Sequence, residues 1–282
     1  MGTCSIRNSI GQTKEKYDAL GEQEWLRFEK RGALGELDYM MNLHFLKKYS
    51  PLTGIALDAG SGPCRFSIEL AKSGLTVLAL DLSENQLEIG QQMVRQALVT
   101  NRIHLVQGSI HNLNMLKPCA FDFVTCIGGA LSHMLEECEL ALSELVQVLK
   151  RGQYIVLSVM SRNCNIDDLS RALWTESSRQ LKRGLHRLAD AQRNRTAYYE
   201  SIGHFRKFSS EELVDLLEEA HLEIVELAAA DRYPLHLQFP LENIRKHVEC
   251  WNELINYETQ ICTLPWVVNS GNMIIAVAKK LH

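Results

Sequence analysis

The sequence lacks long apolar runs. A membrane-spanning helix needs about 18 consecutive apolar residues, and no stretch of the 282 residues offers one. The first twenty residues also lack the apolar core that a signal peptide carries. We therefore expect a protein that is not anchored in a membrane.

Paired cysteines are missing as well. The eight cysteines include no C-x-x-C pair and are scattered through apolar segments. A zinc site would need closely spaced cysteine or histidine ligands, so this pattern argues against a bound metal. It is typical of reduced thiols, and we expect the protein to act in the cytoplasm.

A strong excess of one charge is also absent, because 34 acidic residues nearly balance 30 basic ones and the net charge is −4. Residues 171–207 depart from this balance with nine basic and three acidic side chains. The segment is either a solvated helical face or a surface for a polyanion or an acidic substrate. The composition leaves both readings open.

Strands and helices alternate between residues 54 and 160. Short apolar runs predict strands, and periodic segments with Pro63 in a first turn, Ser83 as a cap and Gly74 at an end predict helices. Such alternation favours a parallel sheet covered on both faces. The expected strands are 54–58, 76–81, 103–108, 121–127 and 154–160, and the expected helices are 63–74, 83–98 and 136–152.

The flanking segments complete one predicted domain. Residues 1–53 form a helical entry or lid segment, with a helix over 12–48, and residues 54–160 form the core. Residues 208–230 and 266–282 add a helix and strands, with a helix and strand over 209–227 and a closing strand over 272–280. The two insertions, 161–207 and 231–265, read as mainly helical, with a helix around 241–258, and could cap the carboxyl edge of the sheet.

The stretch IALDAGSGPCRF, residues 55–66, places an acid and two glycines directly after a strand. Ligands of open α/β sheets bind at the carboxyl ends of strands, where glycine lets the backbone approach them closely. A dinucleotide loop, G-x-G-x-x-G, would need its third glycine at position 65, which is Arg65. Asp58 would also repel a pyrophosphate, so the loop favours a ligand with a cationic group.

A second acid, Asp81, ends the next strand in LALDLS. A carboxylate in that place can accept hydrogen bonds from both hydroxyls of a ribose. A ligand that combines a ribose and a cationic group without a phosphate is S-adenosylmethionine (SAM).

Five ordered motifs resemble those of class I SAM-dependent methyltransferases. The first, D/E-x-G-x-G-x-G, matches at Asp58, Gly60 and Gly62, with Cys64 in place of the third glycine. The others are LALDLSENQLE, VQGSI, FDFVTCIGGALSHM and LKRGQYIVLSVMSR, and together they cover residues 54–160. The resemblance implies a Rossmann-like sheet of seven mostly parallel strands, with helices on both faces and a helical substrate cap.

The resemblance also implies a set of cofactor contacts. Tyr17, in the entry helix YDALGEQEWLRFE, would lie over the methionine end of SAM, and Asp81 would hold the ribose. Ser109 stands where an aspartate is frequent beside the adenine, so the Ile110 backbone would supply that contact. Two structural alternatives stand beside these roles. Asp58 could be an acid at the end of a strand whose hydrogen bonds are satisfied within the protein, and Asp81 could be a helix cap. The expected contacts are Tyr17, Asp58, Gly60, Ser61, Gly62, Asp81, Leu82, Ser109, Ile110 and Ile127.

Methyl transfer needs an acceptor held in line with the sulfonium methyl, and proximity supplies much of the rate. His133, which follows the fourth motif, is the candidate base or orienting group. His204, Arg232 and His236 are candidate substrate contacts from the cap. The alternative for each of the four is packing or surface exposure.

The acceptor is therefore expected to be a small metabolite, methylated on O, N or C. The tail LINYETQICTLPWVVNSGNMIIAVAKK also resembles that of bacterial methyltransferases and of the tRNA carboxymethyluridine methyltransferase, and the basic segment could steer RNA phosphates. A tRNA- or RNA-modifying enzyme is thus the second hypothesis. The third hypothesis is a SAM-binding protein without catalysis. The fourth is a dehydrogenase, which Asp58 and Arg65 disfavour.

Overall fold

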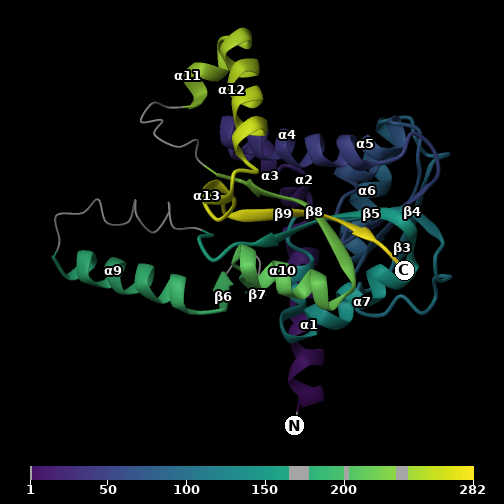
Figure 1. The fold of residues 1–282 in the computed structure, drawn as a ribbon, viewed down its shortest axis with the longest axis horizontal. Coiled ribbons are helices and arrows are strands. Elements are labelled where there is room, and N and C mark those ends of the chain that lie inside the picture. The colour runs from purple at the N-terminus through teal and green to yellow at the C-terminus, as the bar shows by residue number, and fades with distance from the viewer. Residues whose placement is uncertain (1, 165–177, 200–202, 233–240) are drawn as a thin grey trace.

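A seven-stranded sheet with helices on both faces forms the centre of the chain (Figure 1). The computed structural model describes residues 2–164, 178–199, 203–232 and 241–282. Seven strands form the sheet in the order β3-β2-β1-β4-β5-β9-β8. They are β1 (Ile55–Ala59), β2 (Thr76–Asp81), β3 (Ile103–Gln107), β4 (Phe121–Cys126), β5 (Leu149–Met160), β8 (Leu222–Ala230) and β9 (Met273–Lys280).

The sheet is mostly parallel, because only β9 runs antiparallel to its neighbours, β5 and β8. The predicted fold class is confirmed. The strand order reverses between β1 and β4, where Asp58 lies beside Thr125 in the register. In open α/β sheets such a reversal opens a crevice at the carboxyl ends of the strands, which is where ligands bind.

Each face of the sheet is buried under its own helices. One face carries α4 (Gly32–Tyr49), α5 (Arg65–Lys72) and α6 (Glu84–Gln96), and the other carries α7 (Cys138–Val148) and α10 (Ser210–Glu219). Phe45 and Phe123 belong to the first core, Leu142 and Leu217 to the second, and all four are fully buried. Ser83 caps α6 as predicted, since its hydroxyl accepts from the Gln86 N–H.

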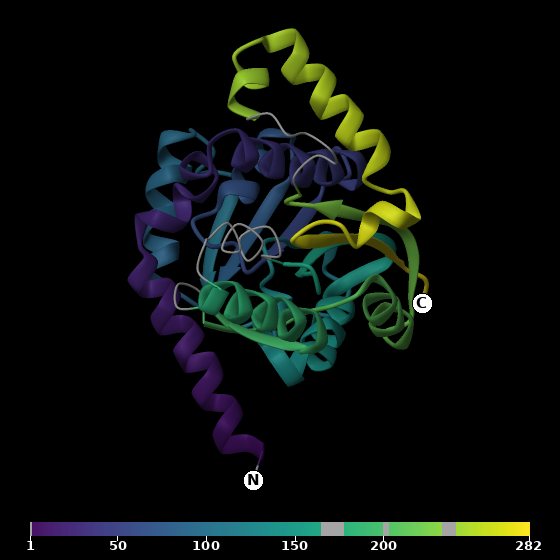
Figure 2. The same ribbon diagram turned by 90° about the vertical axis from the view of Figure 1, so that its left-hand side faces the viewer.

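The single helix expected over residues 12–48 is wrong in its continuity. The chain forms α1 (Gly2–Leu20), α2 (Glu22–Trp25), α3 (Arg27–Lys30) and then α4. Gly21 and Gly32 adopt positive φ angles of 52° and 57°, which end one helix and redirect the chain into the next. These turns fold α1 to α3 across the carboxyl edge of the sheet, the side seen in Figure 2.

The helical expectation for residues 161–207 is also only partly right. The described part holds the helix α9 (Ser178–Arg193), but also a hairpin of β6 (Thr196–Tyr199) and β7 (Gly203–Arg206). Its β7 strand packs against α1 and the 3₁₀ helix η1 (Leu131–Glu137), next to the carboxyl edge. The aromatic and β-branched residues of TAYY favour a strand, although the surrounding basic composition suggests a helix.

The second insertion lies on another side of the molecule. Its helices α11 (Leu241–Arg245) and α12 (Val248–Ile261) pack on α4 and are followed by α13 (Pro265–Val268). Glu242 accepts from the Ala33 N–H at 2.6 Å, and the Trp251 indole donates to Glu36 at 2.9 Å. Figure 2 shows α11 and α12 on the α4 side, opposite α9 and the β6–β7 hairpin.

Candidate cofactor and active site

The loop between β1 and α5 forms a glycine-lined turn at the switch point. Gly60 and Gly62 have φ angles of 78° and 51°, which L-residues with side chains rarely adopt. A Cβ on Gly60 would lie 2.5 Å from the Cβ of Ala130, which follows β4. The loop after β1 and the loop after β4 therefore approach each other so closely that only glycine fits.

A buried carboxylate, Asp58, and a half-buried one, Asp81, flank this loop. Asp58, 2% exposed, accepts from the Ser67 hydroxyl, and Asp81 accepts from the backbone N–H groups of Gly62 and Ser83 at 2.7 and 2.8 Å. Burial raises the pKa of both carboxyls to about 6, and the hydrogen bonds they accept only partly oppose it. Two acids near one pocket favour a ligand that brings positive charge and hydroxyl donors.

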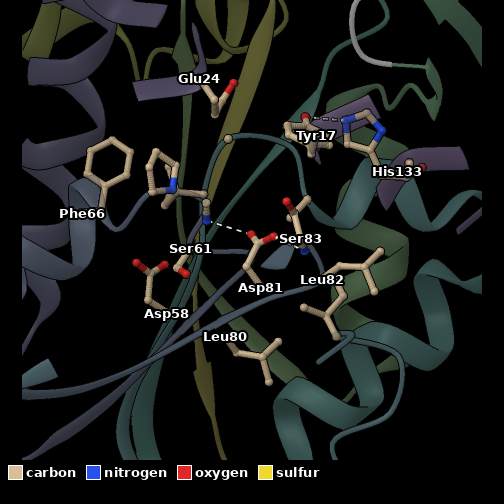
Figure 3. A pocket seen from close by; sticks show the side chains of 18 of the residues that line it. Tyr17, Glu24, Asp58, Ser61, Phe66, Leu80, Asp81, Leu82, Ser83 and His133 are labelled. Carbon is tan, nitrogen blue, oxygen red and sulfur yellow. Dashed lines mark hydrogen bonds between the residues drawn. The ribbon is translucent and has the colours of Figure 1, made fainter. Parts of the chain in front are cut away.

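The loop and the two acids open into a pocket of about 910 Å³, part of which is open to solvent (Figure 3). All ten predicted cofactor contacts line it, and so does His133. Asp81 lies at its centre beneath Ser61 and Ser83, while Tyr17 and His133 face each other at one side. Tyr17 and residues of the first four motifs, spread over more than a hundred residues, thus meet at one site.

The helices α1 to α3 cover this pocket and contribute side chains that the sequence analysis missed. Glu24, Arg27 and Phe28 line it, with Arg27 donating to Glu24 at 2.7 Å. A Cβ on Gly128, just after β4, would lie 2.9 Å from the Arg27 guanidinium. Arg27 therefore lies over the end of β4, where it is placed to meet an anionic group of a ligand.

Arg65 joins this cover to the glycine loop. Its guanidinium lies 4.1 Å from the centre of the Trp25 ring, pairs with Glu29 at 2.8 Å and donates to the Trp25 carbonyl. Arg65, which stands where a dinucleotide-binding loop would have its third glycine, thus holds the helices α2 and α3 against the glycine loop. The only sequence signal for these contacts is the series Trp25, Phe28 and Leu34 at helical spacing, which marks an apolar face without naming its partner.

Tyr17 and His133 form a hydrogen-bonded pair in the pocket. The Tyr17 hydroxyl lies 3.1 Å from His133 Nε2, and His133 Nδ1 lies 3.0 Å from the carbonyl oxygen of His204. Burial lowers the pKa of His133 and raises that of Tyr17. The pair is therefore neutral near pH 7.

Two of the three predicted substrate contacts, His204 and Arg232, do not line this pocket. The His204 side chain is exposed and its ring lies tilted by 48° against that of Tyr198, at 4.7 Å between ring centres, although its backbone holds His133. Arg232 is buried in an ion pair with Glu258 at 2.7 Å. His236 lies outside the described residues.

Two further structural findings bear on the expectations from composition. Among the described residues, no group of three or more His, Cys, Asp or Glu side chains is arranged to hold a metal ion. In the same part of the chain, no helix is both long enough and apolar enough to cross a membrane.

The chain matches the methyltransferase-domain family over residues 56–152. Over 104 residues it is 38% identical to the demethylmenaquinone methyltransferase of Staphylococcus haemolyticus, a match that covers 36% of this chain and 41% of that protein. It is 26% identical over 149 residues to a ubiquinone biosynthesis O-methyltransferase of Paracidovorax citrulli, a match that covers 52% of this chain and 61% of that protein. The chain thus spans about two fifths of the length of the first curated relatives it matches.

Solved structures share the fold over nearly the whole chain. The 1,6-didemethyltoxoflavin-N1-methyltransferase of Burkholderia thailandensis was solved with S-adenosylhomocysteine (SAH). It superposes with a TM-score of 0.59 and 14% identity, and the match covers 100% of this chain and 92% of that one. A SAM-dependent methyltransferase of Methanosarcina mazei superposes with a TM-score of 0.55 and 19% identity, and the match covers 84% of this chain and 97% of that one. The family match identifies residues 56–152 as a methyltransferase domain, and the sheet topology is that of the class I SAM-dependent methyltransferases.

Proposed function

We propose that this protein is a cytoplasmic enzyme that transfers the methyl group of SAM to an O, N or C nucleophile of a small metabolite. The observation that carries the proposal is the pocket at the switch point, where Asp58, Asp81 and the Gly60–Gly62 turn meet. The relatives support it, since the enzymes named above are methyltransferases, one of which was solved with its small acceptor.

The residues present fit the cofactor. Asp81 would accept from the ribose hydroxyls, and Leu82 and Ile110 would flank the adenine. The turn from Gly60 to Gly62 leaves room for the methionine part, with Asp58 nearby as a negative charge. Arg27 would pair with the amino-acid carboxylate. When bound, SAM supplies an activated methyl carbon, and the chain's task is to hold the acceptor in line with it.

The acceptor would enter next to the cofactor, under α1 and near the β6–β7 hairpin. Residues Thr13, Lys14 and Tyr17 of α1 line the pocket, so the cover leaves a site suited to a compact molecule. The insertions 161–207 and 231–265 remain our candidates for the cap. The proposed roles of His204, Arg232 and His236 in acceptor binding rest on the sequence analysis.

Thermal unfolding tests the cofactor assignment. A ligand that binds only the folded state raises the unfolding midpoint with its concentration. We expect SAM and SAH, titrated separately, to raise the midpoint, and NAD to leave it unchanged. A midpoint that responds to NAD but not to SAM would overturn the proposal.

An RNA substrate is the second candidate, favoured by the exposed side chains around α9. Arg179, Lys182, Arg193 and Arg195 are exposed, and Tyr198 is 52% exposed beside the His204 ring. Basic side chains next to an exposed aromatic ring suit phosphates and a stacked base. This surface would extend the same methyl-transfer site to a macromolecular acceptor.

Salt-dependent binding of a tRNA distinguishes the two candidates. If RNA is the substrate, the double substitution Lys182→Glu/Arg183→Glu should abolish binding, while Lys47→Glu/Lys117→Glu, which makes the same charge change at two exposed positions outside α9, should preserve it. Equal binding by both double variants would count against RNA.

A further inference from the structure

The tautomer of His133 follows from its two partners. The His204 carbonyl oxygen can only accept, so His133 Nδ1 carries the proton and donates to it at 3.0 Å. In the neutral ring, Nε2 then holds a lone pair, and the Tyr17 hydroxyl 3.1 Å away donates to it. The imidazole therefore presents its basic nitrogen to Tyr17, and both side chains line the pocket.

Packing from three elements keeps this ring in place and uncharged. His133 is 2% exposed on η1, the Tyr17 ring of α1 meets it edge-on at 5.6 Å, and the Phe205 ring of β7 does so at 6.1 Å. No charged side chain bonds to the imidazole among the described residues. Glu24, Arg27 and Asp81 act electrostatically on Tyr17, the other member of the pair.

Burial alone requires a hydrogen-bond partner at each nitrogen of the His133 ring. The feature that points beyond packing is the identity of one partner, because the Tyr17 hydroxyl that bonds Nε2 belongs to a side chain that lines the ligand pocket. Such an arrangement, in which one group orients the base and another meets the reacting proton, is the one that general-base sites use. The β6–β7 hairpin thus positions a residue of the pocket through its backbone.

We propose that Tyr17 and His133 act together as the general base, and that the acceptor is a compound methylated on an O–H or N–H group, such as a phenol or an aromatic N–H. This inference rests on the proposed function. It narrows the acceptor from any O, N or C nucleophile to one that must lose a proton. Aprotic acceptors, such as tertiary amines and thioethers, would have no use for this pair.

The proton balance of the step is complete within the pocket. The acceptor O–H or N–H donates its proton to the Tyr17 oxygen while the Tyr17 proton moves to His133 Nε2, which leaves an imidazolium still bonded to the His204 carbonyl. The freed acceptor lone pair forms the new bond to the methyl carbon. The bonding pair of the broken C–S bond stays on sulfur, and the imidazolium returns its proton to solvent after the product leaves.

Nuclear magnetic resonance of protein with ¹⁵N-labelled histidine rings tests the pair without an acceptor. In the SAH-saturated protein at pH 7, we expect His133 to be neutral and protonated at Nδ1, and to titrate below the ordinary histidine pKa. Tyr17→Phe should shift the Nε2 resonance and leave the Nδ1 resonance in place. An Nε2-protonated ring, or an imidazolium at pH 7, would overturn the proposal.

Kinetics with tritiated SAM test the acceptor class, using a panel of phenols, catechols, indoles and imidazoles against tertiary amines and thioethers. We expect transfer to members of the first group. Asparagine places an amide nitrogen near the position of His Nδ1, so His133→Asn keeps the bond to His204 but removes the base. It should lower kcat on the best acceptor at least about a hundredfold, and Tyr17→Phe added to it should cost little more.

The pH profile separates a chemical role from a structural one. At saturating SAM, the wild-type kcat/KM for the acceptor should fall only at pH values below the ordinary histidine pKa, because burial lowers the pKa of His133, whereas His133→Asn should follow only the ionisation of the acceptor itself. His44→Asn, on α4 and away from the pocket, should behave like wild type. Transfer to aprotic acceptors alone, or a His133→Asn enzyme within threefold of wild type, would refute the inference.

Cofactor binding by the same variants keeps the two proposals apart. His133→Asn should bind SAH within about threefold of wild type, because its proposed role concerns the acceptor. If the wild-type protein binds neither SAM nor SAH, the proposed function itself fails. If cofactor binding is normal and the NMR and kinetic expectations fail, only the base assignment falls.

Discussion

Cys64 shows how one residue can depart from a motif and leave the site intact. It stands where the third glycine of the first motif is usual, and its backbone is left-handed with a φ of 65°. This conformation costs a residue with a side chain about 1–2 kcal/mol, which explains the usual preference for glycine. The Cys64 sulfur packs on α6, where a Cβ on Gly90 would lie only 2.7 Å from it. A small neighbour therefore accommodates the departure.

Asp81 is the residue whose replacement separates a ribose contact from a helix cap. Ser83 already caps α6, so the Asp81 carboxylate is available to a ligand. Asp81→Asn should weaken SAM binding about 10- to 150-fold, because charge-assisted hydrogen bonds contribute about 1.5–3 kcal/mol. Isothermal titration calorimetry measures this, with Asp215→Asn, at an exposed position of α10, as the control. Unchanged affinity in the Asp81 variant would show that the ribose is held elsewhere.

At the scale of elements, the sequence predicts those parts of the fold that follow from local pattern. The alternation over residues 54–160 predicts the strands of the parallel sheet, because buried strands and amphipathic helices carry different periods. The end of the helix expected over 136–152 is less well placed, since Leu149 already belongs to β5. Residues 149–153, LKRGQ, carry no apolar run that would mark a strand.

The parts of the site that could not be predicted depend on contacts between distant elements. Asp58 and Asp81 follow from motifs, but Glu24 and Arg27 reach the pocket only because the chain turns at Gly21 and Gly32. Neither turn has a strong local signal. The backbone partner of His133 is equally remote, because the His204 carbonyl belongs to a hairpin some 70 residues later in the chain.

Polar contacts help to hold the cover formed by α1 to α3, and their removal should loosen it. Gln86 donates to the carbonyls of Tyr17 and Gly21, and Arg65 holds Trp25 and Glu29. Arg65→Leu removes the stacking and the ion pair together. SAM should then dissociate about tenfold faster, since such contacts are worth about 1–2 kcal/mol when partly buried.

Stopped-flow displacement of bound SAM measures this rate. Lys72→Leu is the matched control, because Lys72 lies at the other end of the same helix and pairs with its neighbour Glu69. A dissociation rate that Arg65→Leu leaves unchanged would mean that α2 and α3 do not gate the pocket.

For the molecule as a whole, binding and proton release are coupled through the two pocket acids. Burial raises the pKa of Asp58 and Asp81 to about 6 in the ligand-free protein. A cationic ligand with ribose donors favours the charged carboxylates, so it should lower both values. The ligand thus binds the deprotonated site, and the affinity must fall as the pH drops through 6.

We expect the SAM dissociation constant to rise between pH 7 and pH 5, by about tenfold if one carboxyl is coupled and about a hundredfold if both are. Calorimetry at pH 6 in buffers of different ionisation enthalpy should show protons released on binding. Asp81→Asn should reduce the pH dependence of the SAM dissociation constant by the part that Asp81 contributes. SAH, which keeps the ribose and the α-ammonium group but lacks the sulfonium charge, should retain the part due to Asp81. A pH-independent affinity, or proton uptake, would mean that these acids do not face the cofactor.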